Sequence, residues 1–312
     1  MKRFRLALKS ILPLAIIDLR YRVRDIRVSL GVRRKYGNSS YVSDLMATLR
    51  AFIRPGKTIL YYPERPPVNM AEYKLCALLG YAITVNPNHR FDVAFKYKDA
   101  TFTDPDILKV IPTDRSMIIN GHSLDISKHA VGAVFAKVFG YDLEVDPTQY
   151  DGNIVEKSNK NGTHDGRIIQ GRISPEDIKP GCVYQKAIDN ESDKEGFVLD
   201  YRVPIHKEQI PLVYRRYHPI ENRFSENAFV EVEETADIFS AEELDKLTLL
   251  TKKMSVDYGE LDVLRDKDGR IYVVDVNNTP AGPPKKLPNQ ACRIALKRMS
   301  KSFAQMLDGR RT

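Results

Sequence analysis

The sequence predicts an α/β (α+β) fold in which a small βαβ domain follows a basic helical arm. Strand-like and helical runs alternate over residues 57–119, as in βαβ units. Further short β-rich runs recur over residues 154–217, and a strong hairpin signal lies at 258–280. The composition, with 42% hydrophobic and 29% charged residues, is that of a globular protein large enough for more than one domain.

Residues 1–50 form the predicted arm, and its apolar residues recur at the four- and three-residue spacing of a helix. They are Leu12, Ile16, Leu19, Val23, Ile26 and Leu30. This apolar stripe packs on the body of the protein or on a second subunit, or it lies on anionic lipid as an interfacial helix. Alternation over residues 19–24 also permits a strand.

The net positive charge is concentrated in the arm. Residues 1–36 hold eleven Lys or Arg and two Asp, a net charge of +9. The remaining 276 residues hold 38 basic and 39 acidic residues and are close to neutral. A basic groove across the folded body is therefore not expected, and nucleic acid is excluded as a partner.

Strands and helices are expected in a regular order after the arm. The first strand is at 58–62, a helix at 70–79 ends at Gly80, and strands follow at 81–85, 91–96 and 116–119. A helix over 125–139 ends at Gly140, and strands follow at 154–157, 167–169, 183–188, 197–204 and 211–217. Ser240 and Glu243 form a capping box for a helix over 241–254.

Cysteine usage and hydropathy indicate a cytoplasmic protein. The three cysteines, Cys76, Cys182 and Cys292, are far apart and form neither a disulfide framework nor a zinc motif. The apolar run over 11–17 contains a proline and is too short to span a bilayer. Peripheral contact with an anionic membrane through residues 1–36 remains an alternative.

The predicted hairpin carries the residues with the clearest chemistry. Two strands, Tyr258–Arg265 and Arg270–Pro280, flank a turn at 266–269. Period-two alternation places Asp262 on one face of its strand, and Asp275 with Asn277 on one face of the other. Oxygen donors of this kind suit magnesium. The alternative is that both Asp residues simply face solvent, but Asp is depleted in strands and residues 277–284 form a specifically shaped loop.

These residues resemble the metal-binding strands of ATP-grasp enzymes. In that family an acidic residue is followed by a second acidic residue and, two positions later, by Asn. Asp262, Asp275 and Asn277 match this pattern, although the second acid is more often Glu. The resemblance implies an ATP-grasp fold that binds ATP and two Mg²⁺ ions, with Mn²⁺ as an alternative metal.

Upstream segments match the family in the same order. Lys157 lies on a strand before a Gly-containing loop, as does the family's phosphate-binding lysine, and Lys128 matches an earlier lysine. The strand 183–188 resembles the hinge strand that recognises adenine. The resemblance implies nucleotide binding by Lys128, Lys157, Gly162, Thr163, His164, Gly166, Gln185, Lys186 and Ile188. The alternative for Lys157 is a surface lysine beside a polar turn.

The resemblance also implies catalytic residues and domain limits. Arg202 and Arg216 are candidates for charge stabilisation at the phosphates, and the backbone near Gly282 for holding an oxyanion. Residues 51–119 form the domain before the ATP-grasp unit. Residues 120–182 form its small, lid subdomain, and 183–312 form its C-terminal subdomain with the metal site.

The expected activity is that of an ATP- and Mg²⁺-dependent ligase, which activates a substrate carboxylate as an acyl phosphate for attack by an amine. The substrate is a small molecule or peptide that carries a carboxylate, and a homodimer is an open alternative. A kinase that phosphorylates a hydroxyl is the second reading and needs a general base. The spacing singles out none of the histidines at positions 122, 129, 164, 206 and 218. A non-catalytic nucleotide-binding or membrane-associated module is the third reading.

Overall fold

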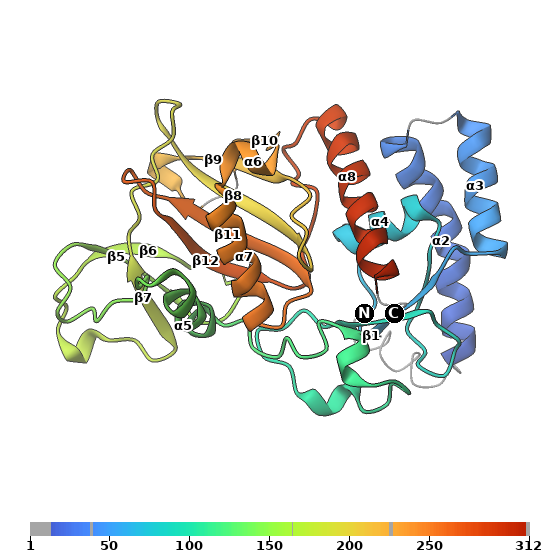
Figure 1. Ribbon diagram of the computed structural model, residues 1–312, viewed down its shortest axis with the longest axis horizontal. Coiled ribbons are helices and arrows are strands. Elements are labelled where there is room, and N and C mark those ends of the chain that lie inside the picture. The colour runs from blue at the N-terminus through green and yellow to red at the C-terminus, as the bar shows by residue number, and fades with distance from the viewer. Residues whose placement is uncertain (1–13, 38–39, 164, 225–226, 310–312) are drawn as a thin grey trace, which may run out of the picture.

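The computed structural model describes residues 14–37, 40–163, 165–224 and 227–309. They form three β-sheets and the helices that cover them (Figure 1). The expected mixed α/β fold is confirmed, with one parallel and two antiparallel sheets. Short 3-10 helices occupy some connections, namely η1 (Pro105–Leu108), η2 (Arg115–Met117), η3 (Pro175–Asp177) and η4 (Ile220–Asn222).

Two helices, α2 (Leu14–Tyr36) and α3 (Tyr41–Ile53), make up the described part of the arm. The helical prediction is therefore confirmed over 19–24, and the strand alternative is wrong. Helix α2 packs on the body, where Asp25 pairs with Arg65 and accepts a hydrogen bond from the Tyr73 hydroxyl at 2.6 Å. Among the described helices, none is long and apolar enough to cross a membrane.

The first sheet follows the arm and has the expected βαβ organisation. Its strands are β1 (Thr58–Pro63), β2 (Ala82–Thr84), β3 (Val93–Tyr97) and β4 (Ile118–Ile119), all parallel in the order β2-β1-β3-β4. Helix α4 (Ala71–Leu79) connects β1 to β2. It ends at Gly80, whose φ of 72° is in the left-handed region that glycine adopts readily.

A small antiparallel sheet comes next. Helix α5 (Lys128–Phe139) precedes β5 (Asn153–Ser158), β6 (Arg167–Gln170) and β7 (Cys182–Lys186), in the order β6-β5-β7. The predicted boundary at 182/183 is wrong, because β7 pairs with β5 along its whole length. The strand assigned to the C-terminal subdomain belongs to this sheet.

The largest sheet is antiparallel, in the order β10-β9-β8-β11-β12. Its strands are β8 (Phe197–His206), β9 (Val213–Pro219), β10 (Phe229–Glu233), β11 (Tyr258–Arg265) and β12 (Ile271–Asn277). Helices α6 (Thr235–Ile238) and α7 (Ala241–Lys253) lie between β10 and β11, and α7 begins with the predicted capping box. The hairpin of β11 and β12 is confirmed, whereas β10 was not predicted.

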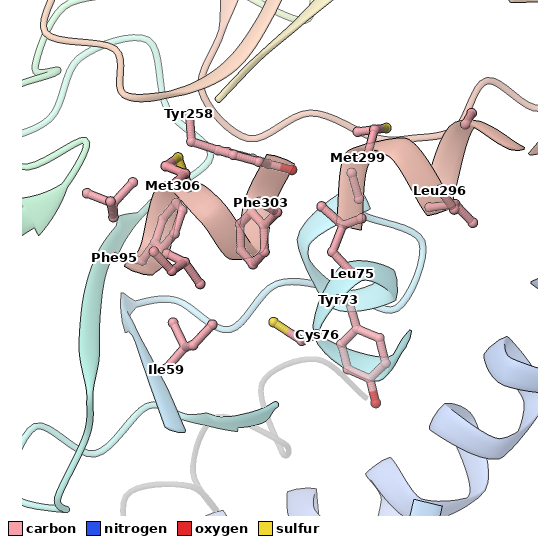
Figure 2. Close-up of a cluster of buried hydrophobic side chains, with 14 of the residues drawn as sticks. Ile59, Tyr73, Leu75, Cys76, Phe95, Tyr258, Leu296, Met299, Phe303 and Met306 are labelled. Carbon is pink, nitrogen blue, oxygen red and sulfur yellow. The ribbon is translucent and has the colours of Figure 1, made fainter. Parts of the chain in front are cut away.

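The last helix, α8 (Asn289–Asp308), was not predicted and returns to the first sheet. Its Met299 and Phe303 are buried in one cluster with Ile59 and Phe95 of that sheet, and with Tyr258 of β11 (Figure 2). Residues 183–312 therefore do not form a separate subdomain, since their final helix completes the core of the preceding domain.

Candidate active site

A cleft of about 330 Å³ lies between the small sheet with α5 and the five-stranded sheet. Its size is in the range of small-molecule sites. Twelve of the predicted site residues line it: Lys128, Lys157, Gly162, Thr163, Gly166, Gln185, Lys186, Ile188, Arg202, Asp262, Asp275 and Asn277. His164, also predicted, lies outside the described residues.

A row of charged side chains crosses the five-stranded sheet at this cleft. Asp262 on β11 is directly opposite Asp275 on β12 and Arg202 on β8. Side chains directly opposite each other in neighbouring strands lie on the same face of a sheet. The sheet therefore fixes two carboxylates and a guanidinium side by side.

Asp262 is held by two arginines. Arg202 Nε donates to its Oδ1 at 3.1 Å, and Arg216 Nη2 lies 3.0 Å from its Oδ2. Burial alone would raise the pKa of Asp262, but the positive charges of Arg202 and Arg216 outweigh burial and lower it well below its usual value. This carboxylate is therefore ionised at any physiological pH.

Asp275 has a different environment. Its Oδ1 accepts a hydrogen bond from the Val276 backbone N–H at 3.1 Å, and no arginine pairs with it among the contacts of the described residues. Burial raises its pKa, as does the charge of Asp262, while Lys128 and Lys157 act in the opposite direction. A buried carboxylate in this state is stabilised by any cation that binds beside it.

The donor set suits Mg²⁺. Asp262, Asp275 and Asn277 offer two carboxylates and an amide oxygen, and a magnesium site usually takes one or two carboxylates from the protein and the rest from phosphates and water. Asn277 Oδ1 accepts from the Thr279 N–H at 2.9 Å, which fixes the direction of the amide. Within the described chain, no group of three or more His, Cys, Asp or Glu side chains is placed to hold a metal ion.

Two lysines face these acids from the other wall of the cleft. Lys157 on β5 donates to the Val274 carbonyl at 3.2 Å, and burial lowers the pKa of its ammonium to about 8. Lys128, at the start of α5, donates to the Lys160 carbonyl at 2.9 Å. Both ammonium groups are bonded only to neutral oxygens in these contacts, which leaves their positive charge available to an anion.

The loop after β5 is docked against the neighbouring elements. Asn161 donates to the Val276 carbonyl at 2.9 Å, and its backbone N–H donates to Thr101 Oγ1 at 2.9 Å. The loop is also braced internally, since Thr163 Oγ1 donates to Asp165 Oδ1 at 3.0 Å. Gly162, with a φ of 73°, allows the chain to turn there.

The cleft also has an apolar surface and a buried amide. Val198, Ile188 and Phe224 line it, together with Gln185 of β7. Gln185 is only 2% exposed, and its Nε2 has no hydrogen-bond partner among the described residues. An unsatisfied buried donor is costly, so this amide is suited to a polar ligand atom.

Two predicted catalytic residues are not among the residues that line the cleft. Arg216 reaches the site through its contact with Asp262, and its Nε also donates to Asp200 Oδ1 at 2.5 Å. Gly282 lies behind Glu260, whose Oε1 is 3.6 Å from the position that a Cβ on Gly282 would take. The Gly282 carbonyl accepts a hydrogen bond from Lys74 of α4.

The sequence reasoning missed several acids and a histidine that line the cleft. Glu260 is 2% exposed and 3.5 Å from Arg202 Nε, and burial raises its pKa to about 7. Asp200 lies 3.1 Å from His218 Nε2. The period of two could have found both acids, because Glu260 precedes Asp262 by two residues and Asp200 precedes Arg202 by two. Asn161, Asp165, Asn190, Arg223 and Phe224 were also missed.

No protein-family model matches the chain, and no curated protein matches it. Solved structures do. The RimK domain protein ATP-grasp from Sphaerobacter thermophilus is 11% identical, with a TM-score of 0.48 over 81% of this chain and 100% of its own. The macrocyclase MdnC from Microcystis aeruginosa, bound to its precursor peptide MdnA, is 12% identical, with a TM-score of 0.46 over 81% and 99%.

A third similar structure is the ATP-grasp ligase PsnB with a minimal precursor, Mg and ADP. It is 13% identical, with a TM-score of 0.46 over 78% of this chain and 98% of its own. In two other PsnB structures the match spans just under two thirds of the neighbour, 66% and 64%.

Proposed function

We propose that this protein is an ATP- and Mg²⁺-dependent ligase of the ATP-grasp type, which activates a substrate carboxylate as an acyl phosphate. The proposal rests on one observation, which is that the two walls of the cleft carry side chains of opposite charge. Lys128 and Lys157 on one wall face Asp262 and Asp275 on the other, within about 330 Å³. Ammonium groups and a pair of carboxylates in one site suit a polyphosphate bound together with a divalent metal.

The nucleotide would lie along the cleft. Lys128 and Lys157 would bind phosphate oxygens as charged donors, which strengthens each hydrogen bond relative to a neutral one. The apolar part of the lining would take the base, and the unsatisfied Gln185 Nε2 can donate to a ring nitrogen. Val198 and Ile188 provide the apolar surface on which the ring would stack.

Asp262, Asp275 and Asn277 would hold Mg²⁺. When bound, the ion neutralises charge on the phosphates. Arg202 lines the cleft and is already held in place by Asp262, so it can stabilise charge on the transferring phosphoryl group without reorganising. Arg216 would act through Asp262, which it holds in position. The docked residues 158–163 would limit the access of water to the reacting groups.

The proposed reaction has two steps. A carboxylate oxygen of the substrate attacks the γ-phosphorus, the bond to the bridging oxygen breaks, and ADP leaves. An amine nitrogen then attacks the carbonyl carbon of the acyl phosphate, and the amine gives up its proton as inorganic phosphate leaves. The products are an amide, ADP and phosphate, and no covalent bond to the protein is needed.

Trapping the intermediate tests this proposal. The protein is incubated with Mg²⁺-ATP, a panel of small and peptide carboxylates, and hydroxylamine in place of the amine. We expect a hydroxamate and an equal amount of ADP, both abolished by Asp275→Ala. Formation of ADP and phosphorylated product without hydroxamate would reject the ligase.

A kinase on the same scaffold is the second candidate, and one contact favours it. His218 lines the cleft with its Nε2 3.1 Å from Asp200 Oδ2, and a histidine oriented by a carboxylate can act as a general base for a hydroxyl. With [γ-³²P]ATP, a kinase would give a stable phosphate ester. Under the same conditions the ligase would release all label as inorganic phosphate.

A further inference from the structure

We propose that α3 docks this protein on an anionic phospholipid surface. Helix α3 carries an apolar stripe that points away from the protein. Val42, Met46, Leu49 and Ile53 recur at spacings of four, three and four, so they lie on one face of the helix. Their side chains are 67%, 62%, 39% and 74% exposed, respectively. The inference does not depend on the proposed ligase activity.

The opposite face of α3 is the one that packs against the rest of the protein. Asp44 and Thr48 are buried, and Thr48 Oγ1 donates to the Asp44 carbonyl at 2.7 Å. Helix α2 is the neighbour on that side, and α3 lies at the outer edge of the molecule (Figure 1). The packing face also includes Ala51 and Phe52, so the four exposed apolar residues are not needed for packing and are in the position of a binding surface.

The charges around the stripe indicate an anionic occupant. Arg50 of α3 and Arg54, the residue that follows its last turn, are exposed next to the stripe, and Arg34 lies over the ring of Tyr41 at 4.9 Å. The only acidic residue of α3 is the buried Asp44, so the outer face of this helix carries positive charge alone. Apolar side chains flanked by arginines are the composition of an interfacial helix on anionic lipid.

The size of the stripe argues against a second copy of the chain as its occupant. A helix of 13 residues is about 20 Å long and about 10 Å wide. A stripe of those dimensions offers only a small part of the roughly 800 Å² that each partner buries in a stable complex. A lipid surface has no such requirement, because apolar side chains enter it singly.

The position of α3 is compatible with access to the cleft. Helix α3 lies at one end of the molecule, and the small sheet β5-β6-β7 that forms one wall of the cleft lies at the other (Figure 1). A protein docked through α3 therefore keeps its cleft open to substrates. The surface would bring the enzyme to substrates at or near a membrane.

Vesicle flotation tests this inference. The full chain is mixed with phosphatidylcholine vesicles that contain or lack about one third phosphatidylserine, at low and at physiological salt. We expect binding only to the anionic vesicles, and weaker binding at the higher salt. The combined change Val42→Gln, Met46→Gln, Leu49→Gln and Ile53→Gln should weaken it by about tenfold or more, and Arg50→Glu with Arg54→Glu by a similar factor.

A matched control separates the stripe from general surface hydrophobicity. Val110, Leu249 and Ile294 are 53%, 42% and 47% exposed on other elements, and their change to Gln should leave flotation unaltered. Circular dichroism checks that each variant is folded. Unchanged flotation of the α3 variant, or no flotation of the wild type, would overturn the inference. So would a wild-type dimer that becomes monomeric in the α3 variant, because the stripe would then join two copies.

Discussion

Replacing Asp262 or Asp275 with Asn tests the description of the cleft, because the surroundings of the two acids predict opposite effects on the free energy of unfolding. Asp262 lies within hydrogen-bonding distance of both Arg202 and Arg216, whereas Asp275 is buried without an arginine partner among the described contacts. Asp262→Asn removes a counter-charge from the buried Arg216 and from the partly buried Arg202. Asp275→Asn removes a carboxylate whose pKa burial has raised, and therefore removes a cost of folding.

The magnitudes follow from the contacts. Loss of one partner from a buried ion pair costs about 3–5 kcal/mol. Because the Asp262 side chain is 24% exposed and Arg216 keeps Asp200, we expect a smaller loss than this, about 2–3 kcal/mol. Asp275→Asn should be neutral or stabilising, because it removes a carboxylate whose charged form burial disfavours. Both variants should lose more than about 99% of ATP turnover, since each removes a carboxylate from the proposed metal site.

Thermal unfolding with and without Mg²⁺-ATP measures both effects. For a chain of this size, 2–3 kcal/mol lowers Tm by several degrees. We expect that fall for Asp262→Asn alone, and loss of the ligand-induced rise in Tm for both variants. An equal fall in Tm for Asp275→Asn would refute the reasoning about its environment. Normal turnover by either variant would refute the metal assignment.

Three further predictions follow from single contacts. Lys157→Ala should weaken ATP binding by about 10- to 100-fold in calorimetry, because a charged hydrogen bond to phosphate contributes roughly 1.5–3 kcal/mol, while the exposed Lys160→Ala serves as the control. Burial lowers the pKa of His206 to about 3, so the unfolded chain gains a proton below pH 6.5 that the folded chain does not. Stability should therefore fall by about 1.4 kcal/mol per pH unit between pH 6.5 and 4.5 in urea titrations. His206→Gln should flatten this slope and His129→Gln should not, and an unchanged slope in His206→Gln would contradict the assignment. Ser240→Ala removes the capping box of α7 and should cost about 1 kcal/mol in the same assay, whereas no loss would show that the cap is dispensable.

Local patterns in the sequence were sufficient to predict the hairpin and many of the residues that line the cleft. The turn at 266–269 joins two alternating runs, so the pairing of β11 with β12 and the shared face of Asp262 and Asp275 could be predicted. The capping box at Ser240 and the glycine at position 80 marked helix ends correctly for the same reason. Each of these features depends on residues close together in the chain.

Features that depend on distant contacts were not predictable in this way. Strand β7 pairs with β5 across a connection of more than twenty residues, and no local pattern separates that choice from pairing with β8. Helix α8 packs on β1, β3 and α4, which precede it by about two hundred residues. The period of two could have placed Glu260 on the same face as Asp262, but its burial beside Arg202 depends on β8, which is distant in the chain.

The arrangement of charges in the cleft has a consequence for nucleotide binding. Arg202 and Arg216 are bonded to Asp262 and Asp200, while Lys128 and Lys157 are bonded to backbone carbonyls. The lysines lose only neutral partners when phosphate binds, so they favour its entry directly. The arginines are already compensated by carboxylates and attract phosphate less. An arginine can interact strongly with phosphate only where new negative charge develops on the phosphate, or where a bound metal ion becomes the partner of the carboxylates. The lysines are therefore suited to binding ATP in its ground state, and Arg202, the one of the two arginines that lines the cleft, to stabilising the phosphoryl group in transfer.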